Sequence, residues 1–459
     1  MTPPTGRGSA TEGALRPGSF AALVAATPAS RDRHADLVRL FAISAVVLGH
    51  WLAVVIVLRD GRLVGQNALA LLPWAHWATW VFQVMPLFFL VGGYANAASW
   101  RSRRERGWNG AFWVRSRALR LLRPTTLFVA VVTVGAFVAR VLGVDPRLVD
   151  AAAWAAGIAL WFLVVYLCVV ALTPVTHAAH ERWGPAVPAA LVTGIALVDL
   201  AHLGLGLPVV GSVNFALVWL CLHQLGFAWR DGTLTRSPVT PWALALGGLA
   251  ALVLLAVPGP YPVSMVGVPG AEVNNTSPPT LALLSLGVCQ IGVALLLRGP
   301  ATRWLRRPRV WTVVVAGNSV IMTLYLWHML PVLVGAVLLY ATGLFPQPPV
   351  GSPLWWVLRL LWVLVLAVVM VPLVAVLGRV ERSPRRPVPP GVPPRAGAWP
   401  VAVGVAAAAG GVFLLGLKSF HGVGPGGLPV AGLAPYAAGL LLLLVAPWAG
   451  RPRSRCSTG

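Results

Sequence analysis

The sequence predicts an all-α integral membrane protein, a polytopic bundle of about twelve transmembrane helices. Of its 459 residues, 58% are hydrophobic and 10% are charged, whereas a soluble domain carries about 25% charged residues. Because so few charges cannot cover a soluble fold of this length, lipid must surround most of the chain. The net charge of +23 does not indicate a nucleic-acid partner, because the arginines lie in short segments between apolar runs.

Twelve apolar runs come close to the length of about 20 residues that a helix needs to cross the hydrocarbon core. They are 35–58, 76–98, 125–144, 148–172, 187–206, 210–229, 240–258, 280–298, 312–341, 353–377, 398–417 and 428–448. The ninth run is long enough to tilt or break. The first ten runs are expected to form a core, and the last two an additional helix pair.

The basic residues of the connecting segments give this bundle an orientation. With a cytoplasmic N-terminus, twelve spans place 29 of the 35 Arg and Lys residues on the cytoplasmic side and 5 outside, and leave Arg359 within a span. This bias follows the positive-inside rule. Both termini are therefore expected in the cytoplasm. The bias toward Arg, Ala, Gly, Val and Leu is typical of a GC-rich bacterial genome, and the chain is expected in the inner (cytoplasmic) membrane.

Composition divides the chain into five segments. Residues 1–30, rich in Pro, Gly, Ser and Ala and without a convincing cleavable signal, are expected to form a disordered cytoplasmic tail. Residues 31–378 form the ten-helix membrane domain, and the Pro- and Arg-rich segment 379–397 a cytoplasmic linker. Residues 398–448 form the additional helix pair, to which no chemistry is assigned, and 449–459 a second cytoplasmic tail.

Ionisable residues inside a membrane are costly and are therefore functional candidates. Arg39 and His50 lie eleven residues apart in the first run, about 20° from three full helical turns, so they share one face about 16 Å apart. This spacing suits a ligand with an anionic end and a distant reactive group, such as acyl-CoA, with His50 as general base. The alternative is a histidine that only bonds a neighbouring helix and an arginine that only marks the cytoplasmic side.

Arginines also recur every three residues after the second run. Arg117, Arg120 and Arg123 would form a basic stripe along a helix, and arginine forks suit phosphate oxygens. The alternative is ordinary positive-inside charge or contact with anionic lipid headgroups.

A second buried imidazole is expected in the ninth run, where Tyr325-Leu326-Trp327-His328 follows Asn318 and Ser319. His328 is either catalytic or a structural histidine held by a neighbour. Weaker candidates are His223, Asp199 and Arg359, with Asp199 a candidate partner for a basic residue across the bundle. The four cysteines form no CxxC, so neither a disulfide framework nor a metal site is expected.

Five motifs in order resemble the transmembrane acyltransferase-3 family over about residues 31–380. They are Arg39 with His50, Pro86–Tyr94, Phe112–Pro124, Leu160-Trp161-Phe162-Leu163 and Leu324–His328. One departure is Gly92-Gly93, where Ser-Gly is commoner in the family, so no hydroxyl role carries over. A second is that no acidic residue follows His50 at the spacing of the HxxxxD acyltransferase motif.

The resemblance implies transfer of an acyl group, often acetyl, from cytoplasmic acyl-CoA to a hydroxyl of a cell-envelope glycan or another small acceptor. It makes His50 the presumed catalytic residue, with Arg39 and His328 beside it as catalytic candidates. Arg117, Arg120 and Arg123 become candidates for donor binding, with Trp161 and Tyr325 from the matched motifs. No metal is implied. The alternatives are a twelve-helix transporter or a glycan flippase without transferase activity, although the second six runs do not repeat the first six.

Overall fold

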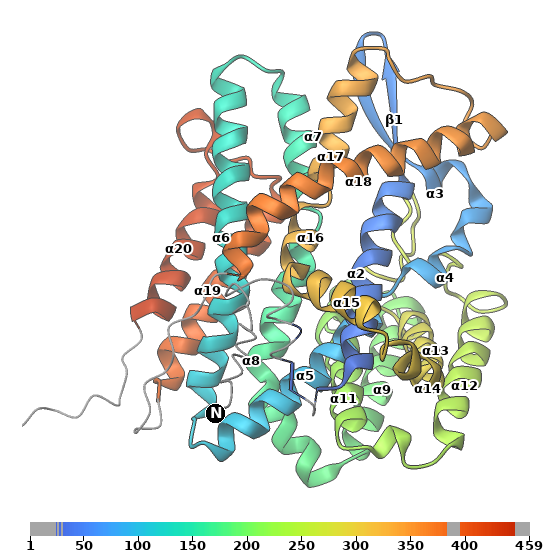
Figure 1. Cartoon of the computed structure of the whole chain (residues 1–459), viewed down its shortest axis with the longest axis vertical. Helices are drawn as coiled ribbons and strands as arrows, with labels where there is room; N and C mark the ends of the chain where they lie inside the picture. Colours follow the sequence, from blue (N-terminus) through green and yellow to red (C-terminus); the bar gives the residue numbers. More distant parts are fainter. Residues whose placement is uncertain (1–23, 25–26, 29–30, 383–394, 446–459) are drawn as a thin grey trace, which may run out of the picture.

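The computed structural model describes residues 24, 27–28, 31–382 and 395–445, so most of the predicted N-terminal tail, most of the predicted linker and the whole predicted C-terminal tail lie outside the described residues. Among the described residues, nine helices are long and apolar enough to cross a membrane, or up to eleven if each of two bent pairs is one span. A helical membrane protein is therefore confirmed (Figure 1). The count of twelve spans and the orientation stay predictions.

Helix α2 spans Arg33–Ala53 and begins where the Asp32 carboxylate accepts hydrogen bonds from the backbone N–H groups of His34 and Ala35. The expected span to residue 58 is wrong at its end. Strands β1 (Val54–Arg59) and β2 (Arg62–Asn67) form an antiparallel hairpin instead. Its β-branched residues favour strand, and Asp60-Gly61, both with positive φ, make the tight turn.

Short elements follow before the next long helices. They are α3 (Ala68–Leu71), η1 (Pro73–His76) and α4 (Thr79–Phe82). The long helices are α5 (Met85–Glu105), α6 (Gly110–Val141), α7 (Pro146–Gly157) and α8 (Leu160–Trp183). The arginine stripe lies in the first half of α6, which continues through Pro124, so the three arginines stand on a helix as the stripe requires.

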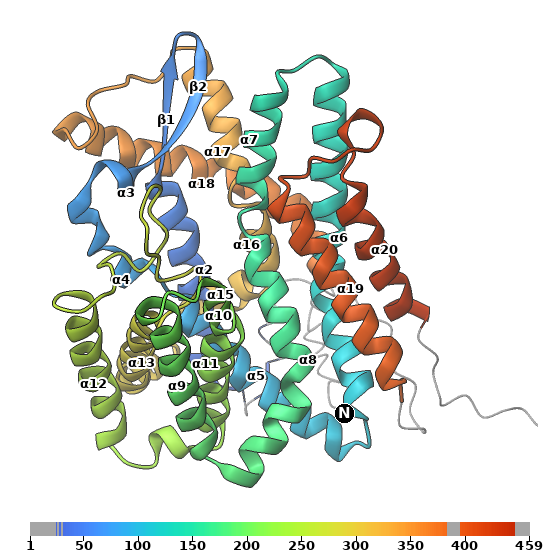
Figure 2. The same cartoon turned by 180° about the vertical axis from the view of Figure 1, so that it is seen from behind.

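The middle of the chain forms a second group of helices, on one side of the molecule in Figures 1 and 2. They are α9 (Ala186–Asp199), η2 (Leu200–Gly204), α10 (Pro208–Gly211), α11 (Asn214–Arg230), η3 (Thr233–Thr235), α12 (Val239–Ala256), α13 (Leu281–Leu296) and α14 (Arg298–Trp304). Helix α11 packs closely on α5. The backbone oxygen of His223 lies so near Gly93 that a Cβ at this position would collide with it. The Gly92-Gly93 pair thus supplies close helix packing.

The ninth predicted span is broken, as its length allowed. Helix α15 (Pro308–Ser319) meets α16 (Ile321–Trp327) at a bend of 58°. Helix α17 (Leu330–Gly335) follows and continues as the π-helical turn η4 (Ala336–Ala341). The start of α16 is held by the Glu381 carboxylate, which accepts hydrogen bonds from the backbone N–H groups of Met322 and Thr323 at 3.1 and 2.9 Å.

Glu381 belongs to α18 (Pro353–Arg382), which crosses the molecule obliquely (Figure 1) and extends into the first residues of the predicted linker. The final pair is α19 (Ala398–Leu417) and α20 (Val430–Val445), joined by η5 (Pro425–Gly427). This pair packs against the body beside α6 (Figure 2). Thr126 of α6 and Tyr436 of α20 share a hydrogen bond of 2.7 Å.

Replacing Gly93 with alanine should destabilise the protein, because the added methyl group must push α5 away from α11 and overpacking costs about 1–3 kcal/mol. The melting temperature in detergent, read by size-exclusion chromatography after heating, should fall. Gly135→Ala is the matched control, because a Cβ there meets nothing within 4 Å. Equal melting temperatures for the two variants would contradict the close contact.

Candidate active site

Arg39 and His50 both lie on α2, which is continuous between them, so the expected alignment on one face holds in the structure. The Asp36 carboxylate is bonded by Arg31 at 2.5 and 3.0 Å, whereas Arg39 Nη1 lies 3.9 Å from the same carboxylate. Arg39 is therefore only loosely engaged by Asp36. Its remaining N–H donors suit an anionic group.

The structure brings together the two histidines that the sequence marked separately. His50 Nδ1 lies 3.1 Å from His328 Nε2, and the ring centroids are 4.9 Å apart. His328 is fully buried, whereas His50 keeps part of its surface accessible. The accessible member of the pair is therefore the one able to meet a ligand.

Hydrogen bonds to the backbone fix the orientation of His328. Its Nδ1 lies 2.7 Å from the carbonyl oxygen of Tyr325, and its own carbonyl accepts a bond of 2.7 Å from Trp51 Nε1. The chain can bend here because His328 and Met329 lie in the break between α16 and α17. His328 is thus held through its backbone by Trp51 of α2 and through its imidazole by the Tyr325 carbonyl of α16.

These contacts favour one tautomer for each neutral ring, and the His50 ring has a further hydrogen bond, to the backbone of Val46. A carbonyl oxygen only accepts, so His328 Nδ1 must donate to Tyr325 and His328 Nε2 must be the acceptor. His50 Nδ1 then donates to His328 Nε2. The lone pair of the His50 ring is left on Nε2, which is the arrangement that a general base requires.

The arginine stripe lies near the opposite end of α16 from the histidine pair. Arg120 interacts electrostatically with Glu381, which caps the start of α16, while His328 follows its end. Seven residues of helix separate Ile321 from His328, a rise of about 10 Å. The stripe and the histidine pair are therefore linked by one short helix.

Helix α6 gives a second, independent link of similar length. Phe128 packs edge-to-face on Trp327, the residue before His328, with ring centroids 5.1 Å apart. Phe128 follows Arg120 by eight residues, about 12 Å along α6. Within the stripe, Arg120 and Arg123 are exposed, whereas Arg117 is half-buried and lies over the Trp113 ring.

The two aromatic candidates for donor binding, Tyr325 and Trp161, contact a backbone carbonyl and other aromatic rings. The Tyr325 hydroxyl donates to the carbonyl oxygen of Ala159 at 2.5 Å and is buried, and Trp161 contacts the rings of Phe162 and Trp219 with 37% of its surface exposed. Tyr325 thus joins α16 to the start of α8. A role of either residue in donor binding stays a prediction.

The weaker candidates have neutral partners. Asp199 accepts hydrogen bonds from Asn214, Tyr261 and the backbone N–H of Leu281, so the expected pairing with a basic side chain is wrong. His223 is fully buried and its Nε2 lies 3.1 Å from Asn96 Nδ2. Neither residue contacts the histidine pair in a bond that the structure records.

Two residues at the site were missed from the sequence. Trp51 fixes the backbone of His328, and Glu381 caps α16. Trp51 directly follows His50, which is a signal that could have been used. Glu381 stands among arginines in a segment that looks like an ordinary cytoplasmic boundary, so no sequence pattern indicated its role.

Comparison with known proteins supports the motif resemblance. The family model described as an acyltransferase domain, that of the acyltransferase-3 family, matches residues 33–379. Comparisons with curated proteins and with solved structures find no match. The matched region holds both histidines and the arginine stripe, and it favours an acyltransferase over a transporter or flippase. The chain belongs to the acyltransferase-3 family of membrane acyltransferases.

Proposed function

We propose that this protein is a membrane O-acyltransferase that moves an acyl group, most simply acetyl, from cytoplasmic acyl-CoA to a hydroxyl of a cell-envelope glycan or another small acceptor. The observation that carries the proposal is the pairing of the partly exposed His50 with the buried His328, an arrangement that favours a lone pair on His50 Nε2. Family membership supports the reaction class.

The donor is bound through its phosphates. Arg120 and Arg123, with Arg39 on α2, hold the phosphates of acyl-CoA by charge-assisted hydrogen bonds. The arm of the donor then extends toward His50, over a helical rise of about 10–16 Å. An elongated donor with phosphates at one end and a thioester at the other matches this separation.

His50 acts on the acceptor. As the acceptor oxygen attacks the thioester carbonyl carbon, His50 Nε2 takes the hydroxyl proton and a tetrahedral intermediate forms. Collapse of the intermediate breaks the carbon–sulfur bond, and the CoA sulfur leaves with the proton returned from His50. Throughout, His50 Nδ1–H donates to His328 Nε2, which stabilises the imidazolium. Arg39 is assigned to the donor and His328 to positioning.

The variant His50→Ala should lose acyl transfer from radiolabelled acetyl-CoA by at least about 100-fold, because general-base catalysis contributes roughly 10²–10⁴-fold. The assay follows label in the acceptor fraction of membranes that contain the full-length protein. His421→Ala is the matched control, because His421 is exposed and pairs with Asp150 rather than with either histidine of the site. Full activity of the His50→Ala variant would contradict the mechanism.

Substitutions of His328 test whether this residue positions His50 or contributes to the binding of acyl-CoA. His328→Leu should lower kcat by roughly 10- to 100-fold and leave KM for acyl-CoA unchanged, because one hydrogen bond to a charged group is lost. His328→Gln, whose amide oxygen can still accept from His50, should recover part of the activity. The account fails if the two variants are equally active or if KM rises with kcat unchanged.

The double variant Arg120→Ala with Arg123→Ala should raise KM for acyl-CoA with little change in kcat, because two phosphate-binding donors are removed. Initial rates over a range of acetyl-CoA concentrations measure both constants. Arg306→Ala with Arg307→Ala removes the same charge from exposed positions outside the stripe. An increase in KM that is the same in both double variants would make the stripe ordinary surface charge.

A further inference from the structure

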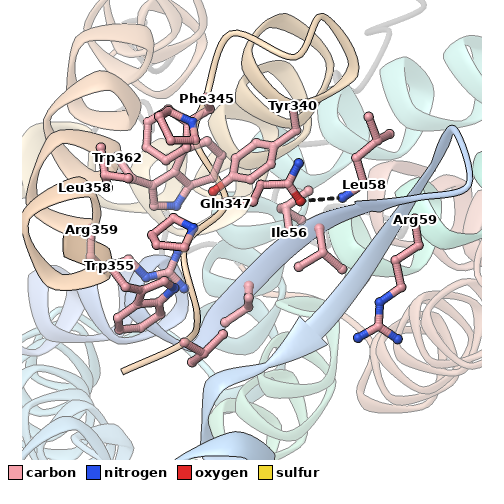
Figure 3. Close-up of a pocket in the computed structure, with 15 residues that line it drawn as sticks. Ile56, Leu58, Arg59, Tyr340, Phe345, Gln347, Trp355, Leu358, Arg359 and Trp362 are labelled. Atoms are coloured by element: carbon pink, nitrogen blue, oxygen red, sulfur yellow. Dashed lines mark hydrogen bonds between the residues drawn. The ribbon is translucent and has the colours of Figure 1, made fainter. Parts of the chain in front are cut away.

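A buried arginine lies close to the end of α2 that carries His50. Arg359, which the sequence leaves within a span, belongs to the wall of a cavity of about 210 Å³ between β1, the segment after η4 and α18 (Figure 3). Only 4% of its surface is exposed, and its guanidinium carbon lies 4.8 Å from the centre of the Trp355 ring. Because a charge inside an apolar region is costly, such an arginine needs partners.

The partners of Arg359 are backbone carbonyls at the end of α2. Arg359 Nη2 donates to the carbonyl oxygen of Leu52 at 3.0 Å and to that of Val54. Helix α2 ends at Ala53 and β1 begins at Val54, so the regular intrahelical hydrogen bonds stop here. In an apolar environment these carbonyls must find other donors, and a cation is favoured at a helix C-terminus. Arg359 therefore stabilises the change from helix to strand.

A chain of two hydrogen bonds connects Arg359 to the backbone of His50. The C=O group of Val54 accepts from Arg359, and the N–H group of Val54 donates to the carbonyl oxygen of His50. Trp51, the residue after His50, donates to the carbonyl oxygen of His328. The last turn of α2, which carries His50, is thus fixed to α18 by Arg359 and to the other histidine by Trp51.

Helix α18 also holds the helix that leads to the second histidine. Glu381, 22 residues after Arg359, accepts hydrogen bonds from the first N–H groups of α16, and His328 follows the end of α16. Arg359 and Glu381 are about 33 Å apart along α18. The cation lies at the C-terminus of α2 and the anion at the N-terminus of α16, which is the favourable arrangement for both helix dipoles. One helix therefore restrains both helices that place the histidine pair.

We propose that Arg359 is a positioning residue for acyl transfer. By fixing the last turn of α2 to α18, it keeps His50 Nδ1 within 3.1 Å of His328 Nε2. This inference rests on the proposed function, in which that contact orients His50 as the base. Arg359 itself does not touch the reacting groups. A purely structural cap would affect folding without changing the contact between the two rings.

The variant Arg359→Met removes the donors and keeps an unbranched side chain that an apolar region tolerates. It should lower kcat by roughly 10- to 100-fold, because a misplacement of about 1 Å can have an effect of this size. KM for acyl-CoA should stay unchanged, because the arginines assigned to the donor are retained. Arg359→Lys, whose ammonium group can still donate to a carbonyl, should recover part of kcat.

Gln347→Ala is the matched control for these kinetics. Gln347 lines the same cavity, but its side chain accepts a hydrogen bond from Leu58 of β1, eight residues after His50. Its loss should leave kcat and KM unchanged. The melting temperature in detergent shows whether each variant is folded. If Arg359→Met is not folded, Arg359→Lys takes its place with a smaller decrease in kcat, because lysine is shorter and lacks the planar fork of arginine.

A second readout does not depend on acyl transfer. Nitrogen-15 NMR of the histidine-labelled full-length protein in lipid reports the hydrogen bond between the two rings. In the folded Arg359 variant the ring signals of His50 and His328 should move, because the bond between them weakens. The signals of His223, which bonds Asn96 of α5, should stay unchanged.

Three results would overturn the proposal. An unaltered kcat in the folded Arg359 variant would show that the cap does not affect the reaction. A lower kcat with unchanged ring signals would show that Arg359 acts elsewhere than on the histidine pair. A higher KM with unchanged kcat would assign Arg359 to donor binding. If the ring signals move as expected while His50→Ala retains acyl transfer, the positioning of His50 stands and the proposed mechanism alone fails.

Discussion

The hydrogen bond between His50 Nδ1 and His328 Nε2 is the interaction on which the account of this membrane protein depends. It joins α2 to the break after α16, and with Nδ1 as the donor it leaves Nε2 of the His50 ring unprotonated. In a low-dielectric interior such a bond is strong, and an unpaired imidazole would be costly. The bond therefore orients a base as well as joining two helices.

The surrounding structure holds this pair in place from three directions. Trp51 bonds the His328 carbonyl, Glu381 caps the far end of α16, and Arg359 secures the last carbonyls of α2. Each of these contacts restrains a helix terminus or a break in a helix, where backbone groups lack intrahelical partners. The polar side chains near the site thus stabilise the irregular backbone that forms it.

Hydropathy alone predicted most of the fold, because a bilayer forces apolar helices of a narrow range of lengths. The predicted span 398–417 matches α19 in both bounds. The predicted span 35–58 is wrong after Ala53, where α2 ends. There the residues stay apolar but become β-branched, and a hydropathy window does not distinguish a strand from a helix end. The hairpin that results forms one wall of the cavity beside Arg359.

The individual site residues were more predictable than their arrangement. His50, His328 and Arg359 each stood out because ionisable groups are rare in apolar runs. Their contacts depend on the 58° bend before α16 and on the course of α18 across the molecule. No spacing within one helix encodes these features, so the pairing of His50 with His328 could not be read from the sequence.

The most direct test of the central claim is the protonation state of the two rings at neutral pH. Nitrogen-15 NMR of the histidine-labelled protein in lipid, with assignments from His50→Gln and His328→Gln, reports which ring nitrogen carries hydrogen. The account predicts that both residues are protonated on Nδ1, with Nε2 of His50 unprotonated. A His50 ring protonated on Nε2 and bare on Nδ1 would contradict it.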